Sequence, residues 1–387
     1  MGARQHLAII GDGAVAAAFL SVARLVPGDR LTLIGPNVHR FGAGRFYADH
    51  DARHPWRLAY LLDRPNGEMT EGFADWLAAE WPVLLPEIAV AQPLHVRRWS
   101  EALSEGAFGD FAAPRAIYGR YLARRSSERL AELVEDGVQV QLITGLATDL
   151  SRADDQFRIT LASGEVIKAD RVDVATGGPA NQRFGVDAGP TAFTTLYDNE
   201  EAIARVLKPG WEVTCLGAST EVLDVMHFLR AAWPTQELRL RVLRDRATPA
   251  LDGDPEYRRL RAAGRIVEEV GRPIWVYAES AGNVRLRITG KECQSQEKTV
   301  PLAINTAGPG DQLLVDILIS GMIAKGWLKL NSAQNRIDVG ARFATDMDGV
   351  RYASDAVAIL NRRPEGVVRQ RVEELVGSFE GDPIETA

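Results

Sequence analysis

Apolar and polar positions alternate along the chain in two patterns. Short apolar or β-branched runs, typical of buried strands, occur at 6–10, 30–35 and 138–145. Residues 116–137 repeat apolar side chains at helical spacing and end at a glycine, which predicts a helix. Residues 156–178 predict a hairpin followed by a further buried strand.

A second set of alternating elements begins near residue 210. Residues 210–231 predict a strand, a glycine turn and a helix, and 238–245 predict the next strand. Strands are also expected at 274–279 and 284–290, and 300–310 add a strand and a Gly/Pro turn. Because strands that alternate with helices favour a mainly parallel sheet, the pattern predicts an α/β protein with two Rossmann-like units.

The composition is typical of a large globular protein and excludes some classes of binding partner. Of 387 residues, 46% are hydrophobic and 25% are charged, which is ordinary for a protein with a sizeable core. The formal net charge of -7 argues against nucleic acid as a partner, because nucleic-acid binders carry a basic face. No apolar stretch reaches the roughly 18 residues that span a bilayer, and the N-terminus does not have the pattern of a signal peptide. We therefore expect a cytoplasmic protein with no membrane partner.

The glycine turn at 11–16, GDGAVA, follows the first predicted strand and fits the pattern G-x-G-x-x-G/A. In that pattern the first glycine makes the tight turn, the second lets a pyrophosphate approach, and the small third residue lets the helix pack closely. The phosphate lies against free N–H groups at the helix N-terminus. A turn that binds no ligand is the alternative. The candidate cofactor-binding residues are Gly11, Gly13, Ala14 and Ala16.

An acid that usually accompanies this pattern is absent. The pattern expects Asp or Glu about 20 residues further on, at the end of the second strand, to bind the ribose hydroxyls. The sequence has Gly35 at that place. Asn37 can still hydrogen-bond a ribose, and Arg40 can face a 2′-phosphate or remain a solvated loop residue. Asn37 and Arg40 are therefore candidates for cofactor binding.

Four stretches carry a resemblance to a known family. They are the opening glycine turn, 111–122 (FAAPRAIYGRYL), 172–179 (VDVATGGP) and 304–310 (INTAGPG). In this order they resemble the bacterial FAD/NAD(P)-binding proteins of the two-dinucleotide-domain, flavin-monooxygenase-like type. The second stretch is similar to that group's Phe-x-Pro-Arg…Tyr-Gly-x-Tyr-Leu signature, and the fourth to its Asn-x-x-Gly-Pro ending.

The resemblance implies an FAD-binding domain with an inserted NAD(P)-binding domain. The expected boundaries are 1–205 for the first part of the FAD domain, 206–310 for the NAD(P) domain and 311–387 for the return to the FAD domain. Arg115 opens a helix and either clamps a pyrophosphate bidentately or forms a helix-start salt bridge. The resemblance also places cofactor contacts at Ala175, Thr176, Gly177 and Gly308.

The second glycine turn, at 217–220 (GAST), retains one glycine where two are usual. Ser219 or Thr220 can cap the next helix and hydrogen-bond a phosphate. Arg244 ends the following strand, where a basic residue can read the 2′-phosphate of NADPH. Gly217, Ser219, Thr220 and Arg244 are therefore candidates, with NADPH favoured over NADH. A purely structural unit is the alternative.

Motifs for nucleophilic or metal catalysis are missing from the sequence. The two cysteines, Cys215 and Cys293, form no Cys-x-x-Cys pair, which excludes a thioredoxin-type redox centre. No metal is expected. The resemblance places the polar segment 42–69 near the flavin ring. His50 and His54 are therefore candidate acid/base or substrate-contacting residues. A structural role is the alternative for each histidine.

These observations predict an FAD-dependent, NADPH-using oxidoreductase that acts on a small molecule. The resemblance points to a monooxygenase that hydroxylates a small polar metabolite. Because Gly35 and the C-terminal stretch 349–366 depart from the family's FAD site, two other readings stay open. One is an NADP-dependent dehydrogenase without flavin, and the other is a non-catalytic nucleotide-binding or scaffold protein.

Overall fold

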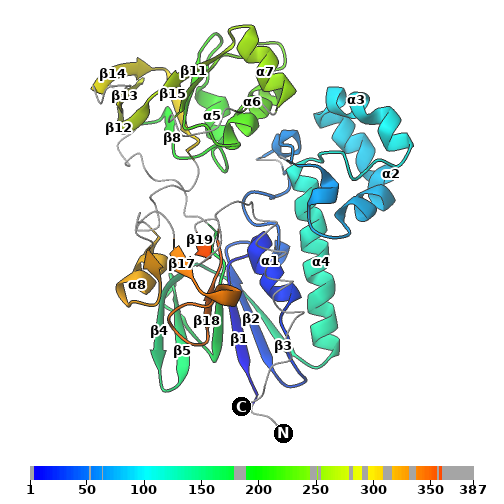
Figure 1. Cartoon of the computed structure of the whole chain (residues 1–387), viewed down its shortest axis with the longest axis vertical. Helices are drawn as coiled ribbons and strands as arrows, with labels where there is room; N and C mark the ends of the chain where they lie inside the picture. The colour runs from blue at the N-terminus through cyan, green and yellow to red at the C-terminus, as the bar shows by residue number, and fades with distance from the viewer. Residues whose placement is uncertain are drawn as a thin grey trace.

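The computed structural model describes residues 4–51, 54–62, 64–177, 189–244, 251, 254–278, 282–289, 295–307, 316–330, 337–354 and 357–359. Within these residues, two five-stranded parallel sheets form the framework (Figure 1). The α/β class with two Rossmann-like sheets, predicted from the alternating pattern, is confirmed.

The first sheet has the order β18-β7-β1-β2-β3. Its central strand is almost entirely buried, as expected for a parallel strand covered on both faces. Leu7 of this strand pairs with Leu31 of β2 on one side and with Arg171 of β7 on the other. The five strands are β1 (His6–Ile10), β2 (Arg30–Gly35), β3 (Gln139–Thr144), β7 (Arg171–Val174) and β18 (Val350–Tyr352).

Helices α1 (Ala14–Ser21) and α4 (Arg115–Glu135) pack together beside this sheet (Figure 1). An antiparallel sheet of β4 (Ala147–Ala153), β5 (Gln156–Leu161) and β6 (Val166–Ala169) shares the same apolar core. The hairpin expected within 156–178 is confirmed as β5 and β6, and β4 adds a strand that the sequence reasoning did not identify. Helix α8 (Ile317–Ala324) packs on β4.

The second sheet has the order β11-β10-β9-β15-β8 and its own core. Its strands are β8 (Ala192–Phe193), β9 (Val213–Leu216), β10 (Leu240–Arg244), β11 (Ile266–Val270) and β15 (Leu302–Asn305). Its helices are α5 (Glu200–Val206), α6 (Glu221–Ala232) and α7 (Pro255–Ala262). An antiparallel sheet of β12 (Arg272–Ala278), β13 (Val284–Thr289) and β14 (Ser295–Val300) packs on this sheet and shares an apolar cluster with β9, β10 and β15 (Figure 1).

The segment between β2 and α4 forms a helical layer over α4. Helix α2 (Phe73–Ala91) packs against α4, α3 (Pro93–Ser104) packs against α2, and together they bury a separate apolar cluster. The remaining short elements are η1 (Val38–Arg40), η2 (Arg57–Ala59), η3 (Asn66–Glu68), η5 (Ala341–Phe343), β16 (Lys329–Leu330), β17 (Ile337–Val339) and β19 (Val357–Ile359).

The chain passes from the first sheet to the second and back. Strand β18, near residue 350, pairs with β7 of the first sheet, whereas β8 and α5, which begin before residue 206, belong to the second sheet and its core. The boundaries at 205 and 310 remain predictions. In the described part of the chain, no helix combines the length and the apolar character needed to cross a membrane.

Candidate cofactor site

Gly11 makes the turn at the carboxyl end of β1, between β2 and β7. Its N–H donates to the Ile34 carbonyl at 2.8 Å, and its φ of +120° lies in a region that favours glycine. A Cβ on Gly11 would overlap the Ala175 carbonyl group, whose carbon would be 2.6 Å away. Only glycine therefore fits where the turn passes the end of β7.

Gly13 precedes α1 and leaves the N-terminus of that helix open. No side chain caps α1, and its first turn holds no acid. The atom nearest to a Cβ on Gly13 would be Gly44 Cα at 3.9 Å, so this glycine is not required by packing. Ala16 is fully buried, as close packing of α1 requires. The N–H groups at the start of α1 have no side-chain cap, and packing does not require the glycine beside them. This arrangement can bind a pyrophosphate.

The end of β2 is closed by Asp12 rather than by a side chain of β2. A Cβ on Gly35 would lie 2.8 Å from Asp12 Cβ. The Asn37 N–H donates to Asp12 Oδ2, and burial raises the pKa of the Asp12 carboxyl. Asn37 is exposed and contacts this turn through its backbone, and Arg40 is also exposed. Their roles in cofactor binding remain predictions.

A loop after η1 closes beside the same turn. The N–H groups of Gly42 and Gly44 donate to the Asp12 carbonyl at 2.8 and 3.1 Å. Gly44 has a φ of +55°, and its Cβ would lie 2.7 Å from Gly13 Cα. The sequence predicted that the segment 42–69 lies near the cofactor, but Gly42 and Gly44 were not identified as the residues that contact the glycine turn.

Residues 175–177 follow β7 and lie next to the first glycine turn. Ala175 is buried, and Gly177 has a φ of +72° with open space around it. Thr176 Oγ1 is buried and has no hydrogen-bond partner among the described residues. A buried hydroxyl without a partner is costly, so this oxygen suits a ligand that would donate or accept a bond there.

The second glycine turn repeats the construction of the first. Gly217 has a φ of +119°, and its Cβ would lie 2.7 Å from Ala307 Cβ, after the neighbouring strand β15. Thr306 Oγ1 donates to the Gly217 carbonyl at 2.6 Å. Ser219 Oγ accepts from the Glu221 N–H at 3.2 Å, whereas Thr220 makes no side-chain cap. Gly308 lies outside the described residues.

Two charged residues of this second unit are already engaged. Glu221 accepts from Thr195 Oγ1 and from the Leu196 N–H, both at 2.8 Å, and burial raises its pKa to about 7. Arg244 Nε lies 3.2 Å from Glu268 Oε2. A 2′-phosphate at Arg244 would compete with this ion pair.

Arg115 begins α4 and points to the second unit. Its Nη1 lies 3.0 Å from Asp224 Oδ2 of α6, and its Nε donates to the Leu61 carbonyl at 3.1 Å. Tyr197 also donates its hydroxyl to Asp224. The structure therefore shows the salt bridge that was one of the two alternatives, and a cofactor contact by Arg115 stays a prediction.

The two candidate histidines lie in the segment between β2 and α2. His50 Nδ1 lies 3.0 Å from Asp49 Oδ1, and its Nε2 lies 3.3 Å from Glu87 Oε1. Arg120 binds both carboxylates. His54 Nδ1 lies 3.0 Å from Asp51 Oδ1. These contacts give both histidines structural partners, and their catalytic roles stay untested.

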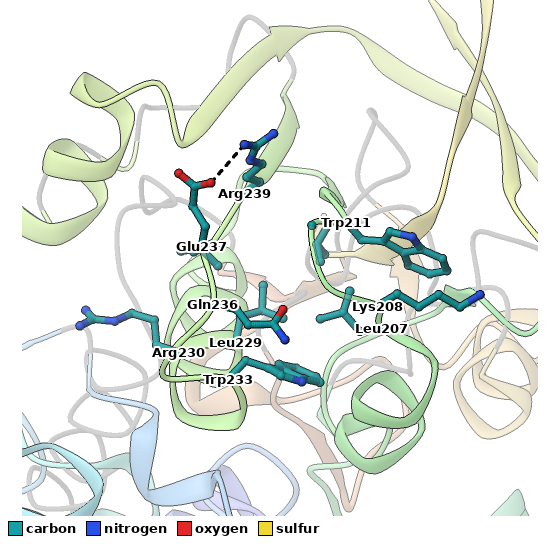
Figure 2. A pocket seen from close by; sticks show the side chains of 12 residues that line it. Leu207, Lys208, Trp211, Leu229, Arg230, Trp233, Gln236, Glu237 and Arg239 are labelled. Carbon is teal, nitrogen blue, oxygen red and sulfur yellow. Dashed lines mark hydrogen bonds and ion pairs between the residues drawn. The ribbon is translucent and has the colours of Figure 1, made fainter.

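A pocket opens at the other end of the second sheet (Figure 2). It has about 380 Å³ of empty space and is lined by Trp211, Val213, Trp233 and Arg239, among others. Val213 is the first residue of β9, whereas Gly217 follows the last, so this pocket lies away from the second glycine turn.

Comparison with known proteins agrees with this geometry. Residues 8–179 match a protein family described as FAD-NAD(P)-binding. No curated protein has a sequence that matches the chain.

Solved structures extend the likeness over the whole chain. A lysine monooxygenase from Nocardia farcinica is 14% identical, with a TM-score of 0.60 and coverage of 97% of this chain and 99% of that one. An ornithine N-hydroxylase from Kutzneria is 13% identical, with a TM-score of 0.55 and coverage of 98% and 99%. A thioredoxin reductase from Lactococcus lactis is 12% identical, with a TM-score of 0.54 and coverage of 98% and 96%.

The chain thus has the fold of the flavoproteins with two dinucleotide-binding domains. The match to the family described as FAD-NAD(P)-binding covers its N-terminal part, residues 8–179.

Proposed function

We propose that this protein is a cytoplasmic, FAD-dependent, NADPH-using oxidoreductase. The observation that carries the proposal is the repeated glycine turn. Gly11 and Gly217 have nearly the same φ, +120° and +119°, and each lies against an alanine within two residues of the end of a neighbouring parallel strand. In doubly wound folds, dinucleotides bind at the carboxyl ends of the strands, beside such turns. Two such turns supply a place for each of two dinucleotides.

The first turn suits FAD better than the second. The open N-terminus of α1 and the space at Gly13 accept a pyrophosphate, and Thr176 Oγ1 offers a further hydrogen bond. FAD, when bound, supplies the redox chemistry, and the chain's own residues bind, orient and shield it.

The second turn suits NADPH. Residues 217–220 would hold its pyrophosphate, and Arg244 would exchange Glu268 for the 2′-phosphate. Glu221 does not oppose this binding strongly, because its carboxyl is buried against Thr195 and Leu196, and its pKa of about 7 keeps it partly protonated.

We further propose that the reaction is hydroxylation of a small polar metabolite. Its balance is NADPH + H⁺ + O₂ + substrate–H → NADP⁺ + substrate–OH + H₂O. Two structural neighbours are named as a lysine monooxygenase and an ornithine N-hydroxylase. Dithiol chemistry of the thioredoxin reductase type is disfavoured, because the chain has no Cys-x-x-Cys and Cys215 is buried.

The test is reduction and reoxidation of the FAD-loaded protein. Under anaerobic conditions, NADPH should bleach the visible flavin band faster than NADH does, and Arg244→Ala should remove that preference. In air, amino acids and amines, with L-lysine and L-ornithine included, are screened for a hydroxylated product formed in step with NADPH use. If NADPH binds but no flavin is retained, the NADP-dependent dehydrogenase is supported instead. If neither cofactor binds, the hypothesis of a non-catalytic scaffold protein is supported.

A further inference from the structure

We propose that Asp12 binds the adenosine ribose of the dinucleotide at the first turn, replacing the acid that usually ends the second strand. The inference rests on the proposed binding of FAD at this turn. It resolves the absence of an acid at Gly35, because it places the carboxylate inside the glycine turn itself.

The space at the end of β2 carries the argument. An ideal Cβ on Gly35 would lie 2.8 Å from Asp12 Cβ, 2.9 Å from its Cγ and 2.9 Å from its Oδ2. The Asp12 carboxyl group therefore fills the space in which a side chain on residue 35 would begin. The two positions exclude each other, so a glycine at 35 is what allows an acid at 12 to lie across the strand end.

The carboxyl group is also held in place. The Asn37 N–H donates to Oδ2, and the Asp12 carbonyl accepts from the N–H groups of Gly42 and Gly44. These contacts hold both the side chain and the backbone of Asp12. The side chain therefore does not have to become ordered when a ligand binds. Such pre-organisation lowers the cost of binding.

Asp12 is a suitable acceptor for sugar hydroxyls. The residue is 8% exposed, and the influences on its carboxyl group among the described residues are burial and backbone hydrogen bonds rather than an ion pair. An ionised carboxylate only accepts hydrogen bonds and has several lone-pair sites, so it can hold Asn37 and still accept from a ribose hydroxyl. Burial raises the pKa of Asp12, and a donated hydroxyl would favour its ionised form.

The alternative is that Asp12 serves only to hold the loop through Asn37. Asp12→Asn separates the two roles, because its amide oxygen can still accept from the Asn37 N–H. The probes are ADP and 2′-deoxy-ADP, each measured by displacement of FAD from the full-length protein, so that flavin fluorescence reports the first site alone.

We expect Asp12→Asn to weaken ADP binding about ten- to a hundredfold, the size of a lost charge-assisted hydrogen bond. The same substitution should change the binding of 2′-deoxy-ADP less than about twofold, because this ligand lacks the 2′-hydroxyl that donates to Asp12. Equal effects on both ligands, or no effect on either, would overturn the inference.

A second variant moves the acid to the usual place. Asp12→Gly clears the space, and Gly35→Glu in the same chain restores a carboxylate at the end of β2. We expect Asp12→Gly alone to lose the preference for ADP over 2′-deoxy-ADP and the double variant to regain it. Retention of the preference by Asp12→Gly would show that Asp12 is not the ribose ligand, and failure of the double variant to regain it would show that an acid at 35 cannot replace one at 12. If the wild-type protein bound no FAD, the proposed function itself would fail, a result distinct from any of these.

Discussion

Arg57 joins the segment before α2 to the second unit, and its replacement by Met should be strongly destabilising. Its side chain is 4% exposed, with Nη2 2.7 Å from Asp198 Oδ1 and Nε 3.2 Å from Glu200 Oε1. Glu200 is fully buried, and its Oε2 has no hydrogen-bond partner among the described residues. Arg57→Met therefore leaves a buried carboxylate without its cation, which costs about 3–5 kcal/mol.

The assay is urea unfolding, read as the free energy of unfolding. Arg205→Met is the matched control, because it removes an ion pair with Glu201, the neighbour of Glu200 on α5. That pair is 71% and 58% exposed, so its loss should cost no more than about 0.5 kcal/mol. Glu200→Gln, added to Arg57→Met, should recover part of the loss because it removes the unpaired charge. Equal costs for Arg57→Met and Arg205→Met would refute this reasoning.

Four further predictions concern the two glycine turns and their neighbours. Gly11→Ala should lower the free energy of unfolding by at least about 1–3 kcal/mol, because of its positive φ and the overlap with Ala175. Gly13→Ala should unfold like the wild type yet lose FAD on gel filtration; retention of FAD would show that the pyrophosphate lies elsewhere. Burial raises the pKa of Glu221 from 4.5 to about 7, so its contribution to stability is fully present below pH 4.5 and is lost as the pH rises to about 7. Relative to Glu221→Gln, the wild type should lose roughly 3 kcal/mol across that range, and parallel pH curves would contradict the assignment. Burial also raises the pKa of the Cys215 thiol, so a thiol reagent should label it in a Cys293→Ser variant only in step with unfolding by urea.

The fold could be predicted from the sequence because its signals are local. β1, β2 and β9 are short apolar runs, and each ends at a glycine whose positive φ or close contact the structure explains. β11 and β14 were missed because charged residues interrupt their alternation: β11 reads IVEEV and β14 reads SQEKTV. In these strands, neighbouring strands rather than the local pattern decide the structure.

The site was harder to predict because its contacts join distant parts of the chain. The absence of an acid at Gly35 was visible, but nothing in the sequence shows that Asp12 fills the same space. Arg115 was recognised as a charged residue at a helix start, whereas its partner Asp224 is more than a hundred positions away. The pairing of Arg57 with Glu200 is likewise set by the packing of the two units rather than by a motif.

The central claim is that the first glycine turn holds FAD. The most direct measurement is the absorption spectrum of the purified protein after incubation with excess FAD and gel filtration, with Gly13→Ala treated in parallel. The account predicts a retained flavin spectrum for the wild type and none for the variant. A colourless wild-type protein, or equal retention by both, would contradict it.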